Sequence, residues 1–313
     1  MTSERMIEID AAHHARLAGL DPLTASPPLR VGDTDEVATV VRRGRCVASV
    51  TRRIESTGPM SPEAAWAPNR IRSWTLRSVV APQLVADELL DALPAVTPTD
   101  DGAEAAWDRA LVASNDLGWT RALVDRGFVP ASVIAARSQR AVDSALPPHV
   151  GFARVRAATA DDLPQMASLG AALQRFDAAT GSIPERPNPS ALLEPRLRHD
   201  LEHHPGWAWV AERTGSIVGM CTVTPPPTSD WVTSFVGVES AGYLGLVYVE
   251  PTFRTTRLGT ALAARAHHRI AEQGIGTSVL HHNPLNPLST PFWARQGYRP
   301  LVTMWQRRPA RRR

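Results

Sequence analysis

The stretch VEPTFRTTRLGTALAARA, residues 249–266, decides how this sequence is interpreted. It continues an apolar, strand-like run, GYLGLVYV, and leads into an amphipathic segment that ends at Gly274. A strand that turns directly into a helix gathers free backbone N–H groups and the positive end of the helix dipole at one point, where an anion binds. The turn holds Arg254 and Arg257, and each arginine costs a bare helix start about 0.3 to 1 kcal/mol. A bound phosphate would reverse that cost, so the stretch predicts either a phosphate-binding turn or a basic helix start.

The segments around this turn predict an α/β (α+β) unit in the second half of the chain. Helix-start residues followed by helical apolar spacing indicate helices, and β-rich runs around a short turn indicate a hairpin. The expected helices span 159–176, 190–204, 258–274 and 289–297, with Pro195 as a candidate break in the second. The expected strands are a hairpin around Arg213–Gly215, a buried strand at 242–251, a strand at 277–282 and a closing strand after Gly297.

The first half of the chain repeats this order. VVRRGRCVASVTRR matches VAERTGSIVGMCTV, SWTLRSVVAPQLVADELLDAL matches GYLGLVYVEPTFRTTRLGTAL, and LVASNDLGWTRALVDRGFVPASVIAARSQR matches LHHNPLNPLSTPFWARQGYRPLVTMWQRR. The matched glycines keep their spacing, because Gly44 and Gly127 lie 83 positions apart and Gly215 and Gly297 lie 82 apart. We therefore predict two mixed-sheet units in tandem. They span residues 1–143 and 152–308, with a proline-bearing linker at 144–151 and a basic tail at 309–313.

Composition and charge argue against several classes of protein. The 34 basic residues are all arginine, and with 31 acidic residues they leave a net charge of +3, too small for a strong field that attracts nucleic acid. Cys46 and Cys221 lie far apart in strand-like runs, as in a reduced cytoplasmic protein and unlike a disulfide scaffold. No apolar run reaches the length of a signal peptide or a membrane span. We expect a cytoplasmic protein that contacts neither membrane nor nucleic acid.

The turn and the residues after it resemble the GNAT acyl-CoA N-acyltransferase superfamily. That family's fingerprint is Arg or Gln, two residues, Gly, one residue, and Gly or Ala after a strand; here Arg254, Arg257 and Gly259 stand at the three marked places. Arg257 departs from the pattern, because a side chain stands where the backbone usually approaches the coenzyme closely. Asn286 is followed by Gly297 and Tyr298 at the family's offsets of eleven and twelve residues.

The resemblance implies an acetyl-CoA-dependent N-acetyltransferase with a GNAT fold. It implies that the strand before the turn, the turn itself and the following asparagine bind the coenzyme. Trp293 would pack in the core or form a wall of the acceptor pocket. The residues concerned are Val247, Tyr248, Val249, Arg254, Thr255, Thr256, Arg257, Leu258, Gly259, Thr260, Asn286 and Trp293.

The first unit resembles the second in layout but lacks the turn. Val85 stands opposite Arg254 and Leu90 opposite Gly259, and Asp87 and Glu88 would repel a pyrophosphate there. This division into a degenerate and a competent unit is similar to the layout of tandem GNAT chains such as those resembling mycothiol synthase. We expect the N-terminal unit to serve as scaffold, interface or part of the substrate wall.

Acyl transfer to an amine needs a base, and three residues are candidates. His281 stands where N-terminal protein acetyltransferases of the superfamily place a glutamate, and an imidazole accepts a proton near neutral pH. Tyr243 and Glu239, on or before the neighbouring strand, are its rivals. The family's acidic tyrosine is replaced by Trp293, which leaves Ser289 or Tyr298 to assist a thiolate that departs readily.

The acceptor, whether a small molecule or a peptide amine, is not identified by the sequence, and neither is the oligomeric state. The substitutions at Arg257 and Trp293 keep an alternative open: a non-catalytic protein that senses acyl-CoA or binds a partner on a decayed GNAT fold. The histidine pairs His203–His204 and His267–His268 lack the spacing of a zinc site and are interpreted as solvated helix ends, so we expect no metal.

Overall fold

The computed structural model of the chain describes residues 3–26, 35–92, 106–139 and 146–308. The expected tail at 309–313 and the start of the expected linker lie outside these residues. Every helix among the described residues is too short or too polar to cross a bilayer.

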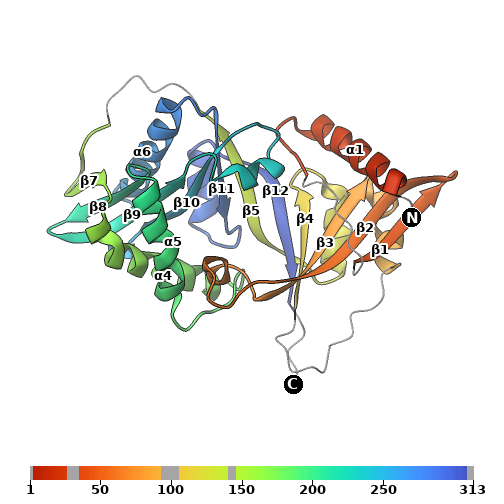
Figure 1. Cartoon of the computed structure of the whole chain (residues 1–313), viewed down its shortest axis with the longest axis horizontal. Coiled ribbons are helices and arrows are strands. Elements are labelled where there is room, and N and C mark those ends of the chain that lie inside the picture. The colour runs from red at the N-terminus through yellow and green to blue at the C-terminus, as the bar shows by residue number, and fades with distance from the viewer. Residues whose placement is uncertain (1–2, 27–34, 93–105, 140–145, 309–313) are drawn as a thin grey trace.

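One continuous sheet of twelve strands runs through the described chain, in the order β1-β2-β3-β4-β12-β5-β11-β10-β9-β8-β7-β6 (Figure 1). The strands are β1 Glu36–Arg42, β2 Arg45–Ser56, β3 Arg70–Ser78, β4 Trp107–Ala113, β5 Val129–Ser138, β6 His149–Val150, β7 Ala153–Ala157, β8 Ala208–Arg213, β9 Ser216–Thr224, β10 Gly242–Val249, β11 Thr277–His282 and β12 Arg299–Arg307. The helices are α1 Ser3–Leu20, α2 Ala86–Asp91, α3 Thr120–Asp125, α4 Leu163–Ala179, α5 Pro189–His203, α6 Leu258–Glu272 and α7 Ser289–Arg295.

The two halves of the sheet repeat one plan, which confirms the prediction of two mixed-sheet units in tandem. Each half opens with an antiparallel hairpin, β1–β2 or β8–β9, whose turn holds two residues with positive φ: Arg43 and Gly44 in the first, Thr214 and Gly215 in the second. Two consecutive positive φ angles give the turn a twist that matches the strands on either side. Each half then continues with a parallel pair, β3·β4 or β10·β11.

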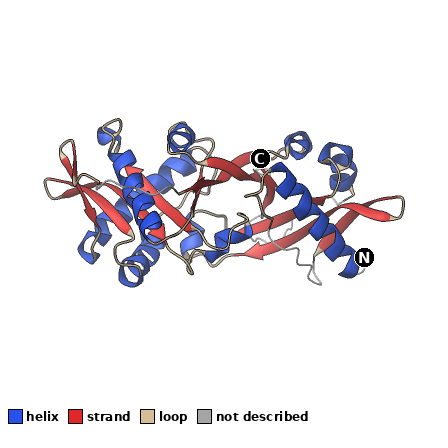
Figure 2. Cartoon of the chain, turned by 90° about the horizontal axis from the view of Figure 1, so that it is seen from above, coloured by secondary structure: helices blue, strands red, loops and turns tan. Residues whose placement is uncertain are grey.

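The two units exchange their last strands at the centre of the sheet. β5, from the N-terminal half, pairs with β11, whereas β12, from the C-terminal half, pairs with β4, and β5 and β12 pair with each other. In Figure 1 these two strands lie side by side in the middle, and Figure 2 shows the molecule extended to both sides of them. The sequence boundary predicted near residue 144 stays a prediction, but the sheet of each half is completed by a strand of the other.

Helices cover both faces of the C-terminal half. The amphipathic α6 buries Leu258, Leu262 and Ile270 against one face, while α4 and α5 pack against the other. The start of α4 follows a capping box, in which Thr159 and Asp162 satisfy each other's backbone N–H groups, at the place where the sequence predicts the start of a helix. Pro195 does not break α5, which continues to His203.

A buried carboxylate anchors the exchanged strand β12 to the N-terminal half. Asp108 on β4 accepts hydrogen bonds from Arg72 (2.9 Å), Trp74 Nε1 (2.9 Å) and Arg307 Nε (2.9 Å). The Arg307 guanidinium, which comes from β12, also lies over the rings of Trp74 and Phe128. The ion pairs of Asp108 therefore join strands that are about 200 residues apart in the sequence.

We expect Asp108→Ala to lower the free energy of unfolding by about 3 to 5 kcal/mol, because it leaves two poorly solvated arginines without their carboxylate. Urea denaturation measures this loss. Asp125→Ala is the matched control: its ion pair with Arg121 is exposed on α3, so the expected change is within about 0.5 kcal/mol. Equal effects of the two substitutions would contradict the anchoring role of Asp108.

Candidate functional site

The sheet opens between β10 and β11. These parallel strands pair only from Gly242 to Leu244, and beyond that point they diverge. On its other edge β10 stays paired with β9, but the register shifts between Leu244 and Val247. Gly245 lies in this bulge, where a Cβ atom would come within 2.9 Å of Thr222 Oγ1, so a glycine is required. The bulge and the lost pairing together produce a wedge-shaped opening in the sheet.

The second half of β10 presents backbone groups to this opening. The N–H groups of Leu246 and Glu250 point to β9, where they bond to Thr222 Oγ1 (2.9 Å) and Val218 O (2.9 Å). Backbone groups alternate between the two edges of a strand, so those of Val247 and Val249 face the opening. Peptide groups of an extended ligand could pair with them as a further strand does.

The turn from β10 to α6 is strained and ends in free amides. Thr255 (φ 69°) and Arg257 (φ 67°) both adopt the left-handed conformation, which costs a non-glycine residue about 1 to 2 kcal/mol. Arg257 is the N-cap of α6, and the first amide to bond back to it is that of Ala261 (3.0 Å). The N–H groups of Leu258, Gly259 and Thr260 have no acceptor within the described chain. Free amides at a helix start are the kind of group to which an anion can bind.

Gly259 is not required by contacts within the protein. A Cβ atom added there would meet the side chains of Phe292 at 3.5 Å and Val249 at 3.8 Å, both ordinary contact distances, and the φ of Gly259 lies outside the positive region. The space in front of this glycine is therefore available to a ligand.

The two arginines of the turn point in different directions. Arg254 turns back: its Nε donates to Val249 O (3.3 Å), and its guanidinium lies over the rings of Phe176 and Tyr248. Arg257 is exposed and lines a shallow, mainly apolar pocket of about 190 Å³ beside α6. The pocket is closed on one side by the segment 146–150, which Arg265 holds through bonds to Leu146 O (3.0 Å) and Pro147 O (2.8 Å).

A cluster of aromatic side chains lies where the opening begins. His281 is the first residue of β11 beyond the last β10 pair, and its Nδ1 lies 3.2 Å from the hydroxyl of Tyr243. Trp231, in the short helix Asp230–Ser234, stacks on the His281 ring (5.7 Å between centroids, 20° between planes) and packs edge-on against Tyr243. The structure thus brings two of the predicted catalytic residues together and adds a tryptophan.

Burial controls the protonation of this pair. It lowers the pKa of His281 to about 4, with smaller contributions from His282 and Arg109, and it raises the pKa of Tyr243 to about 12. At pH 7 the imidazole is therefore neutral and the phenol is protonated. Glu239 is exposed before β10, and no hydrogen bond within the described residues joins it to the pair. Ser289 begins α7 and bonds through its N–H to Asn286.

The other predicted residues downstream of the turn are held by the protein itself. Asn286 is buried; its Nδ2 donates to Asp177 Oδ1 (3.2 Å) and its Oδ1 accepts from Leu288 and Ser289, at the start of α7. Trp293 is buried against Phe292 and Tyr298. Their contribution to a coenzyme site stays a prediction.

The prediction that His267 is solvated is wrong. The helix α6 turns this side chain into the core, where its Nε2 lies 3.1 Å from the hydroxyl of Tyr298, which also contacts Ser278 Oγ (2.8 Å). Burial lowers the pKa of His267 to about 3 and raises that of Tyr298 well above its usual range. Tyr298, one of the two expected acids, is therefore enclosed in a structural hydrogen-bond network.

Two functional candidates escaped the sequence analysis. Trp231 is one of them, and its large exposed fraction, 47 %, is unusual for a tryptophan. Asp177, on α4, accepts hydrogen bonds from Asn283 and Asn286 beyond the end of β11, and burial raises its pKa. No local signal marks Asp177, because its partners lie more than 100 residues away.

Comparisons with known proteins bear on the fold of the chain. Residues 175–298 match the sequence model of the Acetyltransferase (GNAT) family. A GCN5-related N-acetyltransferase from Sphaerobacter thermophilus is 15 % identical, with a TM-score of 0.53 over 90 % of this chain and 84 % of that one. A GCN5-related glucosamine N-acetyltransferase region of a fungal multi-domain GH3 beta-N-acetylglucosaminidase is 12 % identical, with a TM-score of 0.52 over 98 % of this chain and 37 % of that one.

A tandem GNAT protein from the clavulanic acid biosynthesis pathway is also similar, at 12 % identity and a TM-score of 0.45, over 98 % of this chain and 96 % of that one. No curated protein matches the sequence. At these identities the first two solved structures show the shared fold alone.

The buried histidines make stability depend on pH. Burial lowers the pKa of His13 and of His267 to about 3, below the value of about 6.5 in an unfolded chain. The contribution of these histidines to the free energy of unfolding is therefore fully present above pH 6.5 and is lost as the pH falls toward 3. At pH 5 the loss is about 2 kcal/mol for each histidine.

Between pH 7 and pH 5 the free energy of unfolding should fall by about 2 kcal/mol less in His267→Gln than in the wild type. Urea unfolding at both pH values measures this difference. His268→Gln is the control, because this neighbour on α6 is partly exposed and should behave as the wild type. If all three proteins lose the same free energy, His267 does not titrate in this way.

Proposed function

We propose that the C-terminal half of the chain transfers an acetyl group from acetyl-CoA to an amine, on the premise that the match of residues 175–298 to the Acetyltransferase (GNAT) family model reflects a shared activity. The observation that supports the proposal most directly is the opening between β10 and β11, which ends at the free amides of α6. A thioester ligand with a long amide-bearing arm and a pyrophosphate has the chemistry that such an opening and such a helix start would accept.

In this proposal the coenzyme is held mainly by backbone groups. The N–H groups of Leu258, Gly259 and Thr260 bind the pyrophosphate, and the backbone of Val247 together with the N–H of Val249 pairs with the pantetheine arm, since the Val249 carbonyl accepts from Arg254. Arg257, which is exposed beside the helix start, supplies a charge to the phosphates. The strain at Arg257 is consistent with this role, since a left-handed N-cap aims successive amides at one point.

His281 acts as the base in the proposed reaction. The tautomer that can accept a proton at Nε2 carries its hydrogen on Nδ1 and donates it to the Tyr243 oxygen, 3.2 Å away. The acceptor nitrogen attacks the thioester carbonyl, a C–N bond forms, the C–S bond breaks and the sulfur leaves as thiolate, while the amine proton passes to His281. A thiol with a pKa of about 8.5 departs without a strong acid, which fits the enclosure of Tyr298.

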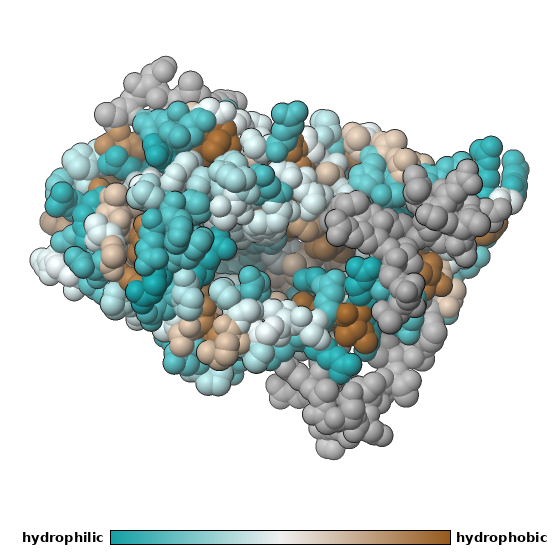
Figure 3. Space-filling view, in the orientation of Figure 1, coloured by the Kyte–Doolittle hydropathy of each residue, from teal (hydrophilic) through white to brown (hydrophobic). Residues whose placement is uncertain are grey.

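The acceptor is an amine of a small molecule or a peptide, and we propose that it enters from the hollow at the centre of the molecule. Figure 3 shows this face hollowed between the helices of the C-terminal half and the strands β1–β3. Trp231 and Tyr243 would then form aromatic walls around the amine, next to His281.

The N-terminal half is proposed to bind no coenzyme. Its parallel pair also opens, since β3 continues to Ser78 while its pairing with β4 ends at Trp74. Side chains of α1 occupy the end of that strand: Arg16 donates to Ser78 O (2.8 Å) and to Asp116, and His13 bonds to Ser78. The acidic start of α2 is paired with Arg42 and Arg126.

The alternative, a non-catalytic acyl-CoA sensor, is favoured by one observation: with a pKa of about 4, His281 is a weak base. Calorimetry with acetyl-CoA tests the shared part of both proposals, and absence of binding would refute both. Thiol release in the presence of a panel of amines separates them, because turnover above background hydrolysis is incompatible with a sensor alone.

Substitution of Arg257 tests the coenzyme site. Arg257→Ala should weaken acetyl-CoA binding by about 10- to 150-fold through loss of a charge-assisted contact. Arg257→Gly should bind more tightly than the alanine variant and raise the free energy of unfolding by roughly 1 kcal/mol, because glycine adopts the left-handed conformation without strain. Calorimetry and urea unfolding measure these effects. Arg121→Ala, on the exposed surface of α3, is the control and should change neither the affinity for acetyl-CoA nor the free energy of unfolding. If Arg257→Ala binds acetyl-CoA as tightly as the wild type, Arg257 makes no phosphate contact.

Substitution of His281 tests the base. His281→Gln should lower kcat by about 10²- to 10⁴-fold with little change in the acetyl-CoA KM, as expected for loss of proton transfer. Tyr243→Phe should cause a smaller loss, since it removes only the hydrogen bond that orients the imidazole. Steady-state kinetics with an accepted amine measures both, and His268→Gln is the surface control. A His281→Gln enzyme with the wild-type kcat would assign the base elsewhere, with Asp177 as the next candidate.

A further inference from the structure

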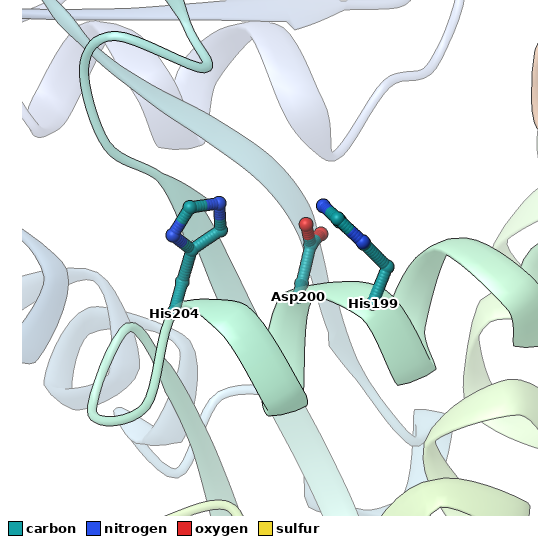
Figure 4. Close-up of side chains that lie close together, drawn as sticks. All are labelled: His199, Asp200 and His204. Carbon is teal, nitrogen blue, oxygen red and sulfur yellow. The ribbon is translucent and has the colours of Figure 1, made fainter.

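The end of α5 carries a second, independent group of residues whose side chains converge. His199, Asp200 and His204 each offer one ligand atom, and these three atoms lie within 4.8 Å of one another. Figure 4 shows the carboxylate of Asp200 between the two imidazoles. We propose that these residues form a binding site for a divalent transition-metal ion such as Zn²⁺, Co²⁺ or Ni²⁺.

The local backbone explains why the three side chains meet. Asp200 and His204 are four residues apart, a spacing that places side chains on the same side of a helix. His204 is the C-cap of α5, with φ −127° and ψ 59°, and its N–H still bonds to Asp200 O (2.9 Å). The chain therefore leaves the helix at His204 without carrying its side chain away from Asp200.

One nitrogen of the His204 imidazole, Nε2, has no hydrogen-bond partner among the described residues. This atom is buried, and in Figure 4 it is the ring nitrogen on the side of Asp200. A buried polar atom without a partner costs about 1 to 3 kcal/mol. A metal ion bound to this nitrogen would satisfy it.

The donor set identifies the class of ion. Two imidazole nitrogens and one carboxylate oxygen suit zinc, cobalt and nickel, whereas magnesium and calcium prefer oxygen ligands alone. Three protein ligands leave a fourth position for water, and the exposure of His199 keeps that position open to solvent.

Arg196 holds the Asp200 carboxylate in place and limits the affinity of the proposed site for a metal ion. Its Nε donates to both carboxylate oxygens (2.9 and 3.0 Å), and its Nη2 donates to Thr224 Oγ1 (2.9 Å). A second residue that orients a ligating carboxylate is common in metal sites. The guanidinium charge opposes a nearby cation, so we expect a reversibly occupied site instead of a tightly held structural ion.

His203 provides an internal comparison. Its ring stacks on His199 (4.2 Å between centroids), and its Nδ1 lies 3.0 Å from His199 O. Two histidines four residues apart on an exposed helix can chelate a metal by themselves, so this pair is the competing explanation for any binding to α5.

Titration of the full, tag-free chain with Zn²⁺ in a calorimeter tests the proposal. We expect one saturable site, and His204→Ala and the conservative Asp200→Asn should each weaken binding by about tenfold or more. His203→Ala and His268→Ala should leave the affinity unchanged. Melting temperatures of the variants without metal establish that each is folded.

Substitution of Co²⁺ adds a readout of the coordination. The intense visible absorption of a four-coordinate Co²⁺ site is expected in the wild type and in His203→Ala, and its loss is expected in His204→Ala. Absence of saturable Zn²⁺ binding would overturn the proposal. It would equally be overturned if His203→Ala removed binding while His204→Ala retained it, since the ion would then occupy the exposed histidine pair.

Discussion

The central pairing of β5 with β12 is the constraint on which the rest of the structure depends. β5, from the N-terminal half, also pairs with β11 of the C-terminal half, and β12, from the C-terminal half, also pairs with β4 of the N-terminal half. Asp108 strengthens this arrangement, because its carboxylate joins β3, β4 and β12 at a poorly solvated point. Neither half has a complete sheet without the other, so the position of β11, and with it His281, is set by both.

The candidate site lies where the strand pairing of the same sheet is interrupted, between β10 and β11. The bulge at Gly245 keeps β10 paired with β9 where its pairing with β11 ends, and the backbone of Val247 and the N–H of Val249 face the opening that results. Regular pairing along the whole of β10 would leave no backbone groups for a ligand. The strained turn at Arg257 follows β10 in the chain, and the free amides of α6 come directly after it. Sheet irregularity and backbone strain are thus concentrated at the proposed coenzyme site.

The elements of the fold could be predicted from the sequence because their signals are local. Apolar spacing located α4, α5 and α6, the turn around Gly215 located the β8–β9 hairpin, and the repeated glycine spacing indicated two similar units. Side-chain environments were less predictable. His267 and His268 are neighbours with the same local pattern, yet the phase of α6 buries the first beneath Tyr298 and leaves the second beside Glu272. A shift of one residue along the helix decides whether a side chain is buried or exposed. Helix boundaries inferred from sequence are no more accurate than one residue.

By itself, the sequence determined the type and order of the elements, the tandem repeat, the turn with Arg254, Arg257 and Gly259, and the resemblance that pointed to acetyl-CoA. These features depend on residues close together in the chain or on a fixed repeat. Only the tertiary structure decided that the two units exchange β5 and β12, that His281, Tyr243 and Trp231 form one cluster, and that His199, Asp200 and His204 converge. Those outcomes depend on strand register, helix phase and backbone geometry at a helix end. Each is selected by packing between distant segments, which no local pattern encodes.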